Sequence, residues 1–358
     1  MEMPARFVIQ KYFPGFQAFP ETLRVFSPRF LCFFCAMTIL PCGMSACAGE
    51  THGRFRITGY LPEYRFNSLN LEQAALLTDL ILFAAEPGPD GIVQMGRVSR
   101  APWEELWSLR EQHQTRLILC LGGWERSTRF SEVVQDPQKR ARLVKSVTDV
   151  LMDRKLNGLD IDWEYPQSPA DWKGYIRLLQ QFQKAFSSRQ LSLSITIAPG
   201  RDLPEDAWKA VDFIQLMSYD YGQQHSTLKQ ARQDIQTFLG RNIPAEKIIL
   251  GVPFYGRNVS DRKAMTYARI VDRFQPAETV DEVDGIYFNN LQTIRQKTAA
   301  ALEAGLGGVM IWEIGQDTAN ETSLLKAIAD TVQTCQVRGR LPVRGELPVH
   351  DELPTGTP

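Results

Sequence analysis

Apolar residues in this chain fall into two alternating patterns. One is a short, nearly continuous apolar run, which is typical of a strand buried on both faces. The other is a longer stretch in which apolar residues recur every three or four positions, as on one face of a helix. From Phe55 onward the short runs predict strands at Phe55–Tyr60, Leu80–Ala85, Arg116–Leu121, Gly158–Glu164, Leu191–Ala198, Phe213–Tyr219, Ile248–Phe254 and Gly308–Glu313.

Helices are predicted between these strands and after the last one. The helix that begins at Pro137 has a good start, because Asp136 is a favoured capping residue and proline is favoured at the first helical position. The pattern predicts helices at Leu71–Thr78, Trp103–His113, Pro137–Lys155, Ala170–Ser187, Asp206–Ala210, Leu228–Leu239, Leu291–Ala304 and Glu321–Thr334.

This alternation of strand and helix predicts an α/β fold with a parallel sheet. Eight strands favour a closed (β/α)8 barrel, the TIM barrel, over residues 53–335, and a doubly wound open sheet is the alternative. The strand count and the size favour the barrel, since such barrels take about 250 residues. The interval between Phe254 and Leu291 contains β-like pieces at Ala264–Ile270 and Gly285–Phe288, so we expect a short insertion after the seventh strand.

The segment 1–47 has the layout of an export signal. Two arginines precede the apolar stretch Phe30–Ala48, and small residues end it. Met44–Cys47 (Met-Ser-Ala-Cys) resembles the box of bacterial lipoproteins, in which the cysteine becomes the lipidated first residue. We therefore expect an exported protein, either a cell-envelope lipoprotein with a lipid anchor at Cys47 or a freely secreted product. An uncleaved anchor is less favoured, because the stretch is barely long enough to span a bilayer.

The segment 336–358 carries a six-residue repeat whose copies begin at Gly339, Gly345 and Asp351. A repeat so rich in proline and charge cannot build a core, and it predicts a disordered Pro-rich tail. A surface scaffold that uses this tail as a partner site is one hypothesis for the function of the chain.

Composition excludes several other classes of function. A formal net charge of −1, with 44% apolar and 23% charged residues, is ordinary for a globular protein, and no basic stripe indicates nucleic acid binding. The four histidines lack metal-ligand spacing, and no Walker-type or dinucleotide-binding loop occurs, so neither a metal nor an organic cofactor is predicted. Outside the N-terminal segment the only cysteines are Cys120 and Cys335, so no disulfide framework is predicted in the barrel region.

The most informative motif is Leu156–Pro166, with the sequence LNGLDIDWEYP. It places Asp160, Asp162 and Glu164 two residues apart, and side chains at that spacing lie on the same face of a strand. A buried row of carboxyl groups is costly unless the groups share protons or find partners, so folds keep it mainly where chemistry needs it. A strand with an acidic outer face is the alternative, but the flanking residues are apolar.

Other candidate residues collect at the carboxyl ends of the predicted strands, where active sites of such barrels lie. Each aromatic residue taken alone would be explained by core packing, but their common position indicates a site. These residues are Tyr60, Trp124, Met217, Tyr219, Asp220 and Trp312.

Aromatic faces beside a carboxylic acid are typical of sugar hydrolysis, because the faces stack on sugar rings and the acid protonates the leaving oxygen. Like-charged neighbours oppose ionisation. We therefore expect Asp160 and Asp162 to share a proton and to help keep Glu164 protonated near neutral pH.

Five segments, in order along the chain, resemble the motifs of one enzyme family. Asn157–Glu164 matches the pattern D-G-x-D-x-D-x-E at every fixed position but the first, Cys120–Gly123 is similar to S-x-G-G, and Met217–Asp220 resembles M-x-Y-D. Gly251–Arg257 and Gly308–Trp312 resemble the seventh and eighth strands of the same family. The family is glycoside hydrolase family 18, the chitinase-like enzymes.

This resemblance implies a retaining glycosidase, without cofactor and monomeric, that hydrolyses β-1,4-linked N-acetylglucosamine-containing oligo- or polysaccharides by substrate-assisted catalysis. The substrate's 2-acetamido group would attack the anomeric carbon and form an oxazolinium intermediate. Glu164 would be the acid and then the base, Asp162 would orient the acetamido group, and Asp160 would share its proton. Tyr219 would hydrogen-bond the acetamido carbonyl, and Trp312 would form the floor beneath the sugar. Further sugar contacts are expected from Tyr60, Met217, Asp220 and Trp124.

Two residues depart from the family pattern. Asn157 replaces the first aspartate of the signature, but it is three residues from Asp160 and should face away from the barrel centre. Cys120 replaces a serine that supports the deep carboxyl group in the family. A thiol is a weaker donor, so we expect Cys120 to change how Asp160 and Asp162 titrate.

The resemblance leaves the glycan open. Chitin, chito-oligosaccharides, peptidoglycan-type chains and the chitobiose core of N-glycans, the substrate of an endo-β-N-acetylglucosaminidase, all fit. A catalytically weak, lectin-like sugar-binding protein is the alternative from another class, although such proteins typically lose the acid that is present here as Glu164. The short insertion after the seventh strand predicts a shallow, open cleft.

The lipoprotein hypothesis makes a direct prediction. Mass spectrometry of the mature N-terminus is expected to show a diacylglyceryl modification on Cys47, and an unmodified first residue there would contradict the hypothesis.

Overall fold

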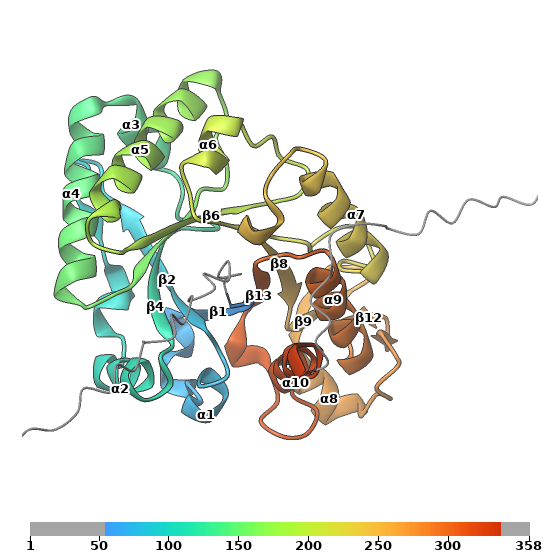
Figure 1. Cartoon of the computed structure of the whole chain (residues 1–358). Coiled ribbons are helices and arrows are strands. Elements are labelled where there is room, and N and C mark those ends of the chain that lie inside the picture. Colours follow the sequence, from blue (N-terminus) through green and yellow to red (C-terminus); the bar gives the residue numbers. More distant parts are fainter. Residues whose placement is uncertain (1–53, 338–358) are drawn as a thin grey trace, which may run out of the picture. The chain divides into compact units, whose positions relative to one another are not determined.

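The computed structural model of the chain describes residues 54–337, and in it eight parallel strands form a closed barrel. The first strand pairs with both the second and the last, which closes the sheet and confirms the barrel over the open sheet (Figure 1). The barrel strands are β1 Arg56–Pro62, β2 Asp79–Pro87, β4 Arg116–Gly122, β5 Gly158–Asp162, β6 Ser192–Ile197, β7 Phe213–Leu216, β8 Ile248–Pro253 and β13 Gly308–Trp312.

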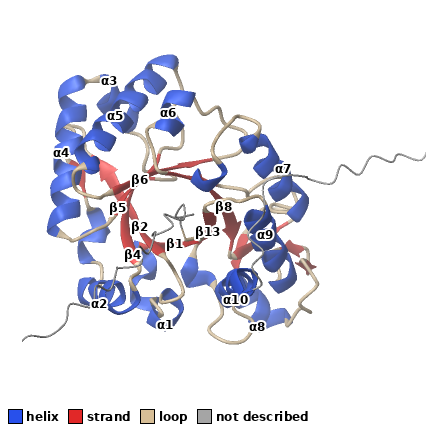
Figure 2. Cartoon of the chain, in the orientation of Figure 1, coloured by secondary structure: helices blue, strands red, loops and turns tan. Residues whose placement is uncertain are grey.

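Helices surround the strands on the outside of the barrel (Figure 2). Asp136 caps α4 as predicted, since its side chain accepts hydrogen bonds from the backbone N–H groups of Gln138 and Lys139. The helices are α1 Leu71–Ala74, α2 Trp103–His113, α3 Phe130–Gln135, α4 Pro137–Asp153, α5 Pro169–Ser187, α6 Glu205–Lys209, α7 Leu228–Leu239, α9 Leu291–Glu303 and α10 Leu324–Val337, with 3-10 turns η1 Glu63–Ser68, η2 Gly96–Arg100, η3 Ala245–Lys247 and η4 Ile314–Gln316.

The predicted insertion after β8 is a small antiparallel sheet with one helix. Its strands lie in the order β10-β9-β12-β11, and they are β9 Tyr255–Asn258, β10 Ala264–Thr266, β11 Glu282–Val283 and β12 Ile286–Tyr287. The strand predicted over Ala264–Ile270 is wrong beyond Thr266, because the Thr266 side chain accepts a hydrogen bond from the Arg269 N–H and starts α8 Tyr267–Phe274.

Two further differences concern strands. The short strand β3 Val93–Gln94, which pairs antiparallel with β2, was not predicted. Strands β5 and β7 end earlier than predicted, at Asp162 and Leu216. Beyond Asp162 the backbone leaves the ladder, and the Glu164 N–H donates to the Ser127 hydroxyl instead of to a neighbouring strand.

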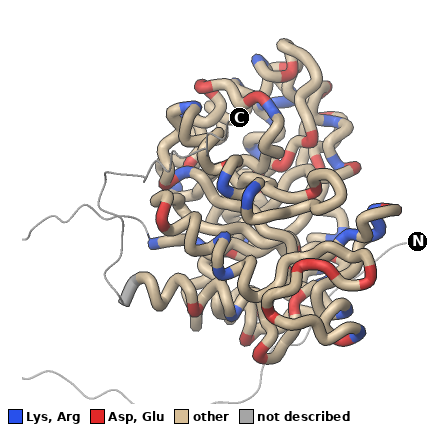
Figure 3. The backbone as a smooth tube through the Cα atoms, turned by 90° about the vertical axis from the view of Figure 1, so that its right-hand side faces the viewer, with Lys and Arg blue, Asp and Glu red and all other residues tan. Residues whose placement is uncertain are grey.

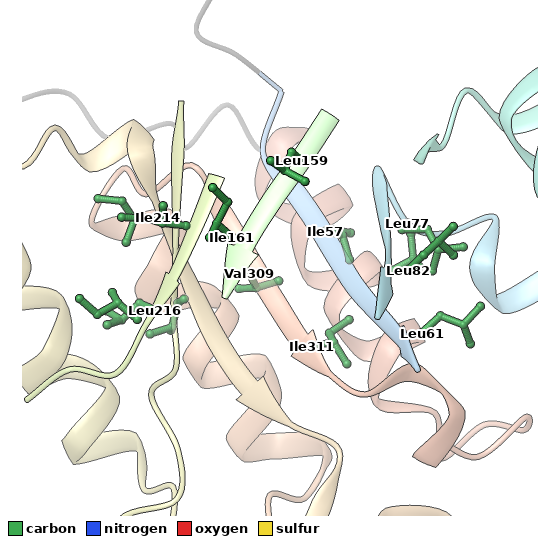
Figure 4. Close-up of a cluster of buried hydrophobic side chains, with 14 of the residues drawn as sticks. Ile57, Leu61, Leu77, Leu82, Leu159, Ile161, Ile214, Leu216, Val309 and Ile311 are labelled. Atoms are coloured by element: carbon green, nitrogen blue, oxygen red, sulfur yellow. The ribbon is translucent and has the colours of Figure 1, made fainter. Parts of the chain in front are cut away.

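The alternation of residues along the strands separates two cores. Outward-pointing residues pack against the helices, and Figure 4 shows part of this layer, including Leu159 and Ile161 of β5. The residues between them point into the barrel, where a smaller cluster is formed by Tyr60, Ile81, Phe83, Ala84, Ile118, Cys120, Ile249 and Met310. The acidic positions of β5 therefore face the small interior cluster and not the helices.

Charged residues of both signs are interspersed over the face drawn in Figure 3. Within residues 54–337, none of the helices combines the length and the apolar character needed to cross a bilayer. The N-terminal segment and the repeat tail, for which the sequence predicts an export signal and an extension, lie outside the described residues.

At the opposite end of the barrel from the carboxyl ends of the strands, one buried carboxylate joins the first residues of three strands. Both oxygens of Asp79 accept from Arg56, at 2.8 and 2.7 Å, and one accepts from Arg116 at 3.2 Å. The Asp79 side chain is 6% exposed, whereas the two arginines are 22% and 27% exposed. The cluster therefore links β1, β2 and β4 where the barrel closes.

Asp79→Asn should destabilise the protein, because it leaves two half-buried guanidinium groups without a counter-ion. We expect a loss of about 2–3 kcal/mol in the free energy of unfolding, below the range for a fully buried pair because the arginines are partly solvated. Urea denaturation measures the change. Asp149→Asn is the control, since Asp149 pairs with Lys145 on the exposed surface, and equal effects of the two variants would contradict this role of Asp79.

Candidate active site

Asp160 lies deepest in the barrel and is fully buried. Its carboxylate accepts hydrogen bonds from the hydroxyl groups of Tyr60 at 2.8 Å, Ser194 at 2.6 Å and Thr196 at 2.9 Å. Burial raises the pKa of Asp160, and these hydroxyl donors oppose the rise. Sequence reasoning missed Ser194 and Thr196, although two polar residues at alternate positions of an apolar strand are a usable signal of an interior polar partner.

Asp162 lies between the other two acids and is 3% exposed. Burial raises its pKa well above the usual value, and the nearby Glu164 and Asp160 raise it further. Its Oδ1 is buried and has no hydrogen-bond partner among residues 54–337. A buried carboxyl oxygen without a hydrogen-bond donor destabilises the protein, so Oδ1 of Asp162 is free to accept a hydrogen bond from a bound ligand.

Glu164 is the outermost acid and is only partly buried. Burial raises its pKa, the Tyr165 hydroxyl opposes the rise, and the charge of Asp220 adds to it. The predicted order of the row, with Asp160 deep and Glu164 at the mouth, is therefore found in the structure. A carboxyl group of this kind can exchange protons with a bound molecule at a pH where an ordinary glutamate is ionised.

A cavity of about 180 Å³ lies between the loops that follow β5 and β6. None of the three acids lines it, and its lining includes Trp163, Tyr175 and Ile195 of the helix-facing core. Tyr165, Thr196 and Arg201 are among the residues that line it, and the Arg201 guanidinium lies 4.1 Å from the centre of the Tyr165 ring. The volume is sufficient for several water molecules, since each occupies about 30 Å³ in the liquid.

The two departures from the family motif lie where the sequence predicts them. Asn157 directly precedes β5, and its side chain accepts a hydrogen bond from the Leu117 N–H at 3.0 Å. Cys120 is fully buried and pairs in register with Asp160 across β4 and β5. Burial, followed by the charge of Asp160, raises the pKa of the Cys120 thiol well above its usual value, so the thiol stays protonated beneath the row.

Two glycines at the end of β4 allow the chain to pass close to the row. Gly122 and Gly123 have φ angles of +102° and +104°, which side chains rarely tolerate. A Cβ at Gly122 would lie 2.4 Å from the Asp162 backbone oxygen, and one at Gly123 would lie 2.3 Å from the Phe83 ring. The Gly-Gly pair of the motif is therefore a requirement of space.

Aromatic residues pack against one another next to Asp160, to which Tyr60 donates. Trp312 packs against Tyr60, with ring centres 5.4 Å apart, and edge-on against Phe83 at 4.9 Å. Met217 and Tyr219 contact the same interior cluster. Phe83 was not among the predicted residues, because one phenylalanine in an apolar strand cannot be told from ordinary core packing.

Tyr219 lies just beyond the end of β7 with its hydroxyl 3.9 Å from the Met310 sulfur. Burial raises the pKa of Tyr219 well above its usual value, so its hydroxyl remains a hydrogen-bond donor at neutral pH. The Met310 sulfur is a weak acceptor at this distance, so the Tyr219 hydroxyl remains available to a ligand.

Asp220 is next to Tyr219, but its carboxylate is already engaged. It forms a two-pronged ion pair with Arg257, in which the Nη2 distance is 2.7 Å, and it lies 3.6 Å from Nδ1 of His225. Burial would raise the pKa of Asp220, but the adjacent His225 ring and the hydrogen bonds from Arg257 lower it well below the usual range. The sequence did not predict Arg257 or His225 as partners.

Trp124 is the predicted residue that the structure does not bring into this group. It is 70% exposed on the loop that follows β4. Within residues 54–337 no cluster of three or more histidine, cysteine, aspartate or glutamate side chains has a geometry that could hold a metal ion.

Comparison with known proteins identifies the motif set. The family model described as "Glycosyl hydrolases family 18" matches residues 56–317. "Probable chitinase 2" of Drosophila melanogaster is 27% identical over 220 residues, which cover 54% of this chain and 44% of that protein. "Chitotriosidase-1" of Mus musculus is 26% identical over 289 residues, with 60% and 61% covered. The chain thus spans less than two thirds of the length of these relatives.

Solved structures show the same fold. A GH18 chitinase from the chitin utilization locus of Flavobacterium johnsoniae has a TM-score of 0.71 and 26% identity, with 78% of this chain and 94% of that chain covered. A class V chitinase from Nicotiana tobaccum, solved in complex with NAG4, has a TM-score of 0.68 and 21% identity, with 78% and 99% covered.

Asp162→Asn tests the electrostatics of the row without reference to any activity. The folded wild type holds protons that the unfolded chain releases above about pH 4, so its stability falls as the pH rises. The variant lacks the buried ionisable group. We therefore expect the free energy of unfolding of Asp162→Asn, minus that of the wild type, to increase with pH. The slope should be about 1.4 kcal/mol per pH unit for each proton that the folded wild type retains and its unfolded chain releases. Urea denaturation between about pH 4 and about pH 8 measures this, and a pH-independent difference would contradict the burial of a charged row.

Proposed function

The chain belongs to glycosyl hydrolase family 18, and from this membership we propose that it hydrolyses β-1,4-linked N-acetylglucosamine glycans, chitin or chito-oligosaccharides. The observation that carries the proposal is the buried Asp162 carboxyl oxygen without a partner, directly behind the half-buried Glu164. The relatives named above carry the names of a probable chitinase and a chitotriosidase, and one structural neighbour was solved in complex with NAG4. A formal net charge of −1 also fits an uncharged ligand.

Glu164 supplies the acid in this mechanism. Burial raises its pKa, which favours the protonated form, and its position at the mouth of the barrel lets it donate that proton to the glycosidic oxygen as the bond to the anomeric carbon breaks. The group then carries a negative charge. In the second step it takes a proton from water, so that the hydroxide equivalent attacks the anomeric carbon and Glu164 returns to its starting state.

The substrate's own acetamido oxygen is the nucleophile in the proposed first step. It forms a bond to the anomeric carbon as the leaving oxygen departs, which gives a cyclic oxazolinium ion. Asp162 accepts the hydrogen bond of the acetamido N–H through its unpartnered Oδ1 and stabilises the positive charge that develops. Two displacements at one carbon retain its configuration.

Asp160 controls the charge of Asp162. Two adjacent buried carboxylates cannot both ionise cheaply, so a proton is shared between them, and Asp160 takes the charge when Asp162 must hold the proton. The three hydroxyl donors to Asp160, from Tyr60, Ser194 and Thr196, stabilise that charged form.

The remaining residues place the sugar. The free hydroxyl of Tyr219 donates to the acetamido carbonyl oxygen, and Trp312 provides an apolar floor for one face of the ring, with Met217 beside it. Asp220 and Trp124 are proposed as outer sugar contacts, Asp220 in its ion pair with Arg257 and Trp124 by its exposed ring.

Export is a second part of the proposal and is supported by the residues alone. The apolar stretch Phe30–Ala48 and Cys47 fit a cell-envelope lipoprotein, which would place the barrel where polymeric glycans are accessible.

Glu164→Gln should lower kcat for release of a chromogenic aglycone from a chitobioside by about 10²–10⁴-fold, the usual contribution of a general acid. Binding of the substrate should remain, because the amide keeps the shape of the side chain. Glu303→Gln is the matched control, since Glu303 is an exposed glutamate at the end of α9, and it should act at the wild-type rate.

Equal rates for the wild type and Glu164→Gln would contradict the proposal. A wild type that binds chito-oligosaccharides without releasing product would instead make the chain a sugar-binding member of the family.

A further inference from the structure

A buried lysine lies behind the segment that carries Tyr219 and Asp220. Lys297 of α9 is fully buried, and α9 packs against α7 on the outside of the barrel (Figure 1). The segment Met217–Ser226 joins β7 to α7 and therefore passes between the barrel mouth and these helices. None of the proposed catalytic steps uses Lys297, which makes its burial a cost that needs an explanation.

All three protons of the Lys297 ammonium group have acceptors. Its Nζ donates to the Ser226 carbonyl oxygen at 2.8 Å, to the Ser226 hydroxyl oxygen at 2.7 Å and to Oδ1 of Asn289 at 2.7 Å. The Asn289 amide donates in turn to the Ser226 carbonyl oxygen at 2.7 Å. No carboxylate is in contact with Nζ among the described residues, so the group is held by neutral acceptors.

The Ser226 hydroxyl transmits this contact to the active site. Because its oxygen accepts from Lys297, its own proton must point elsewhere, and it donates to the Ser218 carbonyl oxygen at 2.9 Å. Ser218 directly precedes Tyr219, and its side chain donates to Asp234 of α7. Two hydrogen bonds thus hold Ser218, the residue before Tyr219: Ser226 donates to its carbonyl oxygen, and its hydroxyl donates to Asp234.

We propose that Lys297 is a positioning residue, whose ammonium group orients the Ser226 hydroxyl and thereby fixes the Ser218–Asp220 backbone that presents Tyr219 to the substrate. This inference rests on the proposed function for its kinetic consequences only, since the fixing of the segment is a property of the protein alone.

Proton counting gives the proposal a pH dependence. A neutral amine has two protons and one lone pair, so the Ser226 hydroxyl can turn its proton to Nζ and release the Ser218 carbonyl. Burial lowers the pKa of Lys297 to about 7, while Asp281 and Asp234 oppose the fall. The other titratable groups nearby are His225, whose pKa burial lowers, and its partner Asp220.

Stability and positioning therefore change in opposite directions with pH. The pKa of Lys297 is lower in the folded protein than in the unfolded chain, so the folded state binds fewer protons between about pH 7 and about pH 10, and this group adds stability as the pH rises. The orientation of Ser226 is lost over the same range. A merely structural lysine would make function and stability move together.

Lys297→Met is the test variant, and Lys247→Met is its matched control. Lys247 also donates to backbone carbonyl groups, those of Trp208 and Val211, but it lies at the start of β8, at the other end of the barrel. Hydrogen–deuterium exchange of the full-length protein is measured on the peptide that spans residues 217–226. In the wild type, local opening of this segment must break the contacts between Lys297 and Ser226. These contacts are absent from Lys297→Met, so its exchange should be at least about tenfold faster than that of the wild type. Lys247→Met should exchange at the wild-type rate.

The exchange result decides the proposal whether or not the protein hydrolyses chitobiosides. Unchanged exchange of residues 217–226 in Lys297→Met, or the same change in Lys247→Met, would overturn it. If the wild type does not hydrolyse chitobiosides, the proposed function is overturned, but the exchange of residues 217–226 still decides the role of Lys297.

Kinetics test the link to catalysis. Lys297→Met should lower kcat by up to about 100-fold with a smaller change in KM, because misplacement of a catalytic group affects the transition state most. Ser226→Ala should have a similar effect, and the double variant should be no worse than either, since both remove the same connection. The part of the wild-type fall in kcat above about pH 7 that comes from Lys297 should be absent from both variants, and only the fall caused by ionisation of Glu164 should remain. Additive losses, or an unchanged alkaline fall, would contradict the orientation of Ser226 by Lys297.

Discussion

The burial of three carboxyl groups in the barrel interior is the constraint on which the rest of the site depends. Strand β5 places Asp160 and Asp162 on one face, which the closed barrel turns away from water, and Glu164 follows two residues beyond the end of the strand. Burial raises the pKa of all three groups. The row can therefore persist only with protons retained or with donors supplied, and both solutions occur along its length.

The two ends of the row solve the constraint differently. At the deep end, three hydroxyl groups stabilise Asp160, and Cys120 contributes a weak donor where the family pattern has a serine. In the middle, Asp162 keeps an oxygen without a partner. At the mouth, Glu164 is partly exposed to solvent. Asp160 thus has hydrogen-bond partners, whereas Asp162 keeps an oxygen free for a ligand. Such an arrangement suits a proton donor with a binding group next to it.

The parts of this arrangement that follow from short-range patterns were predictable from the sequence. Alternation fixed the facing of the row, and the apolar runs located every barrel strand to within a few residues. Contacts between segments far apart were not predictable. Ser194, Arg257 and Lys297 act through partners that only the closed barrel brings near, and nothing local distinguishes a buried lysine in an amphipathic helix from a solvated one. The end of β5 was misplaced because a side-chain acceptor, Ser127, replaces the ladder there.

A direct titration of the row tests the central claim most directly. Carboxyl ¹³C chemical shifts of Asp160, Asp162 and Glu164 can be followed in the labelled protein, with Asp162→Asn used for assignment. The account predicts that at least one of the three groups stays protonated above about pH 6, well beyond the ordinary range of aspartate and glutamate, and that the titrations are coupled. Independent titration of all three groups near about pH 4 would contradict the account, because the row would then carry its full charge at neutral pH.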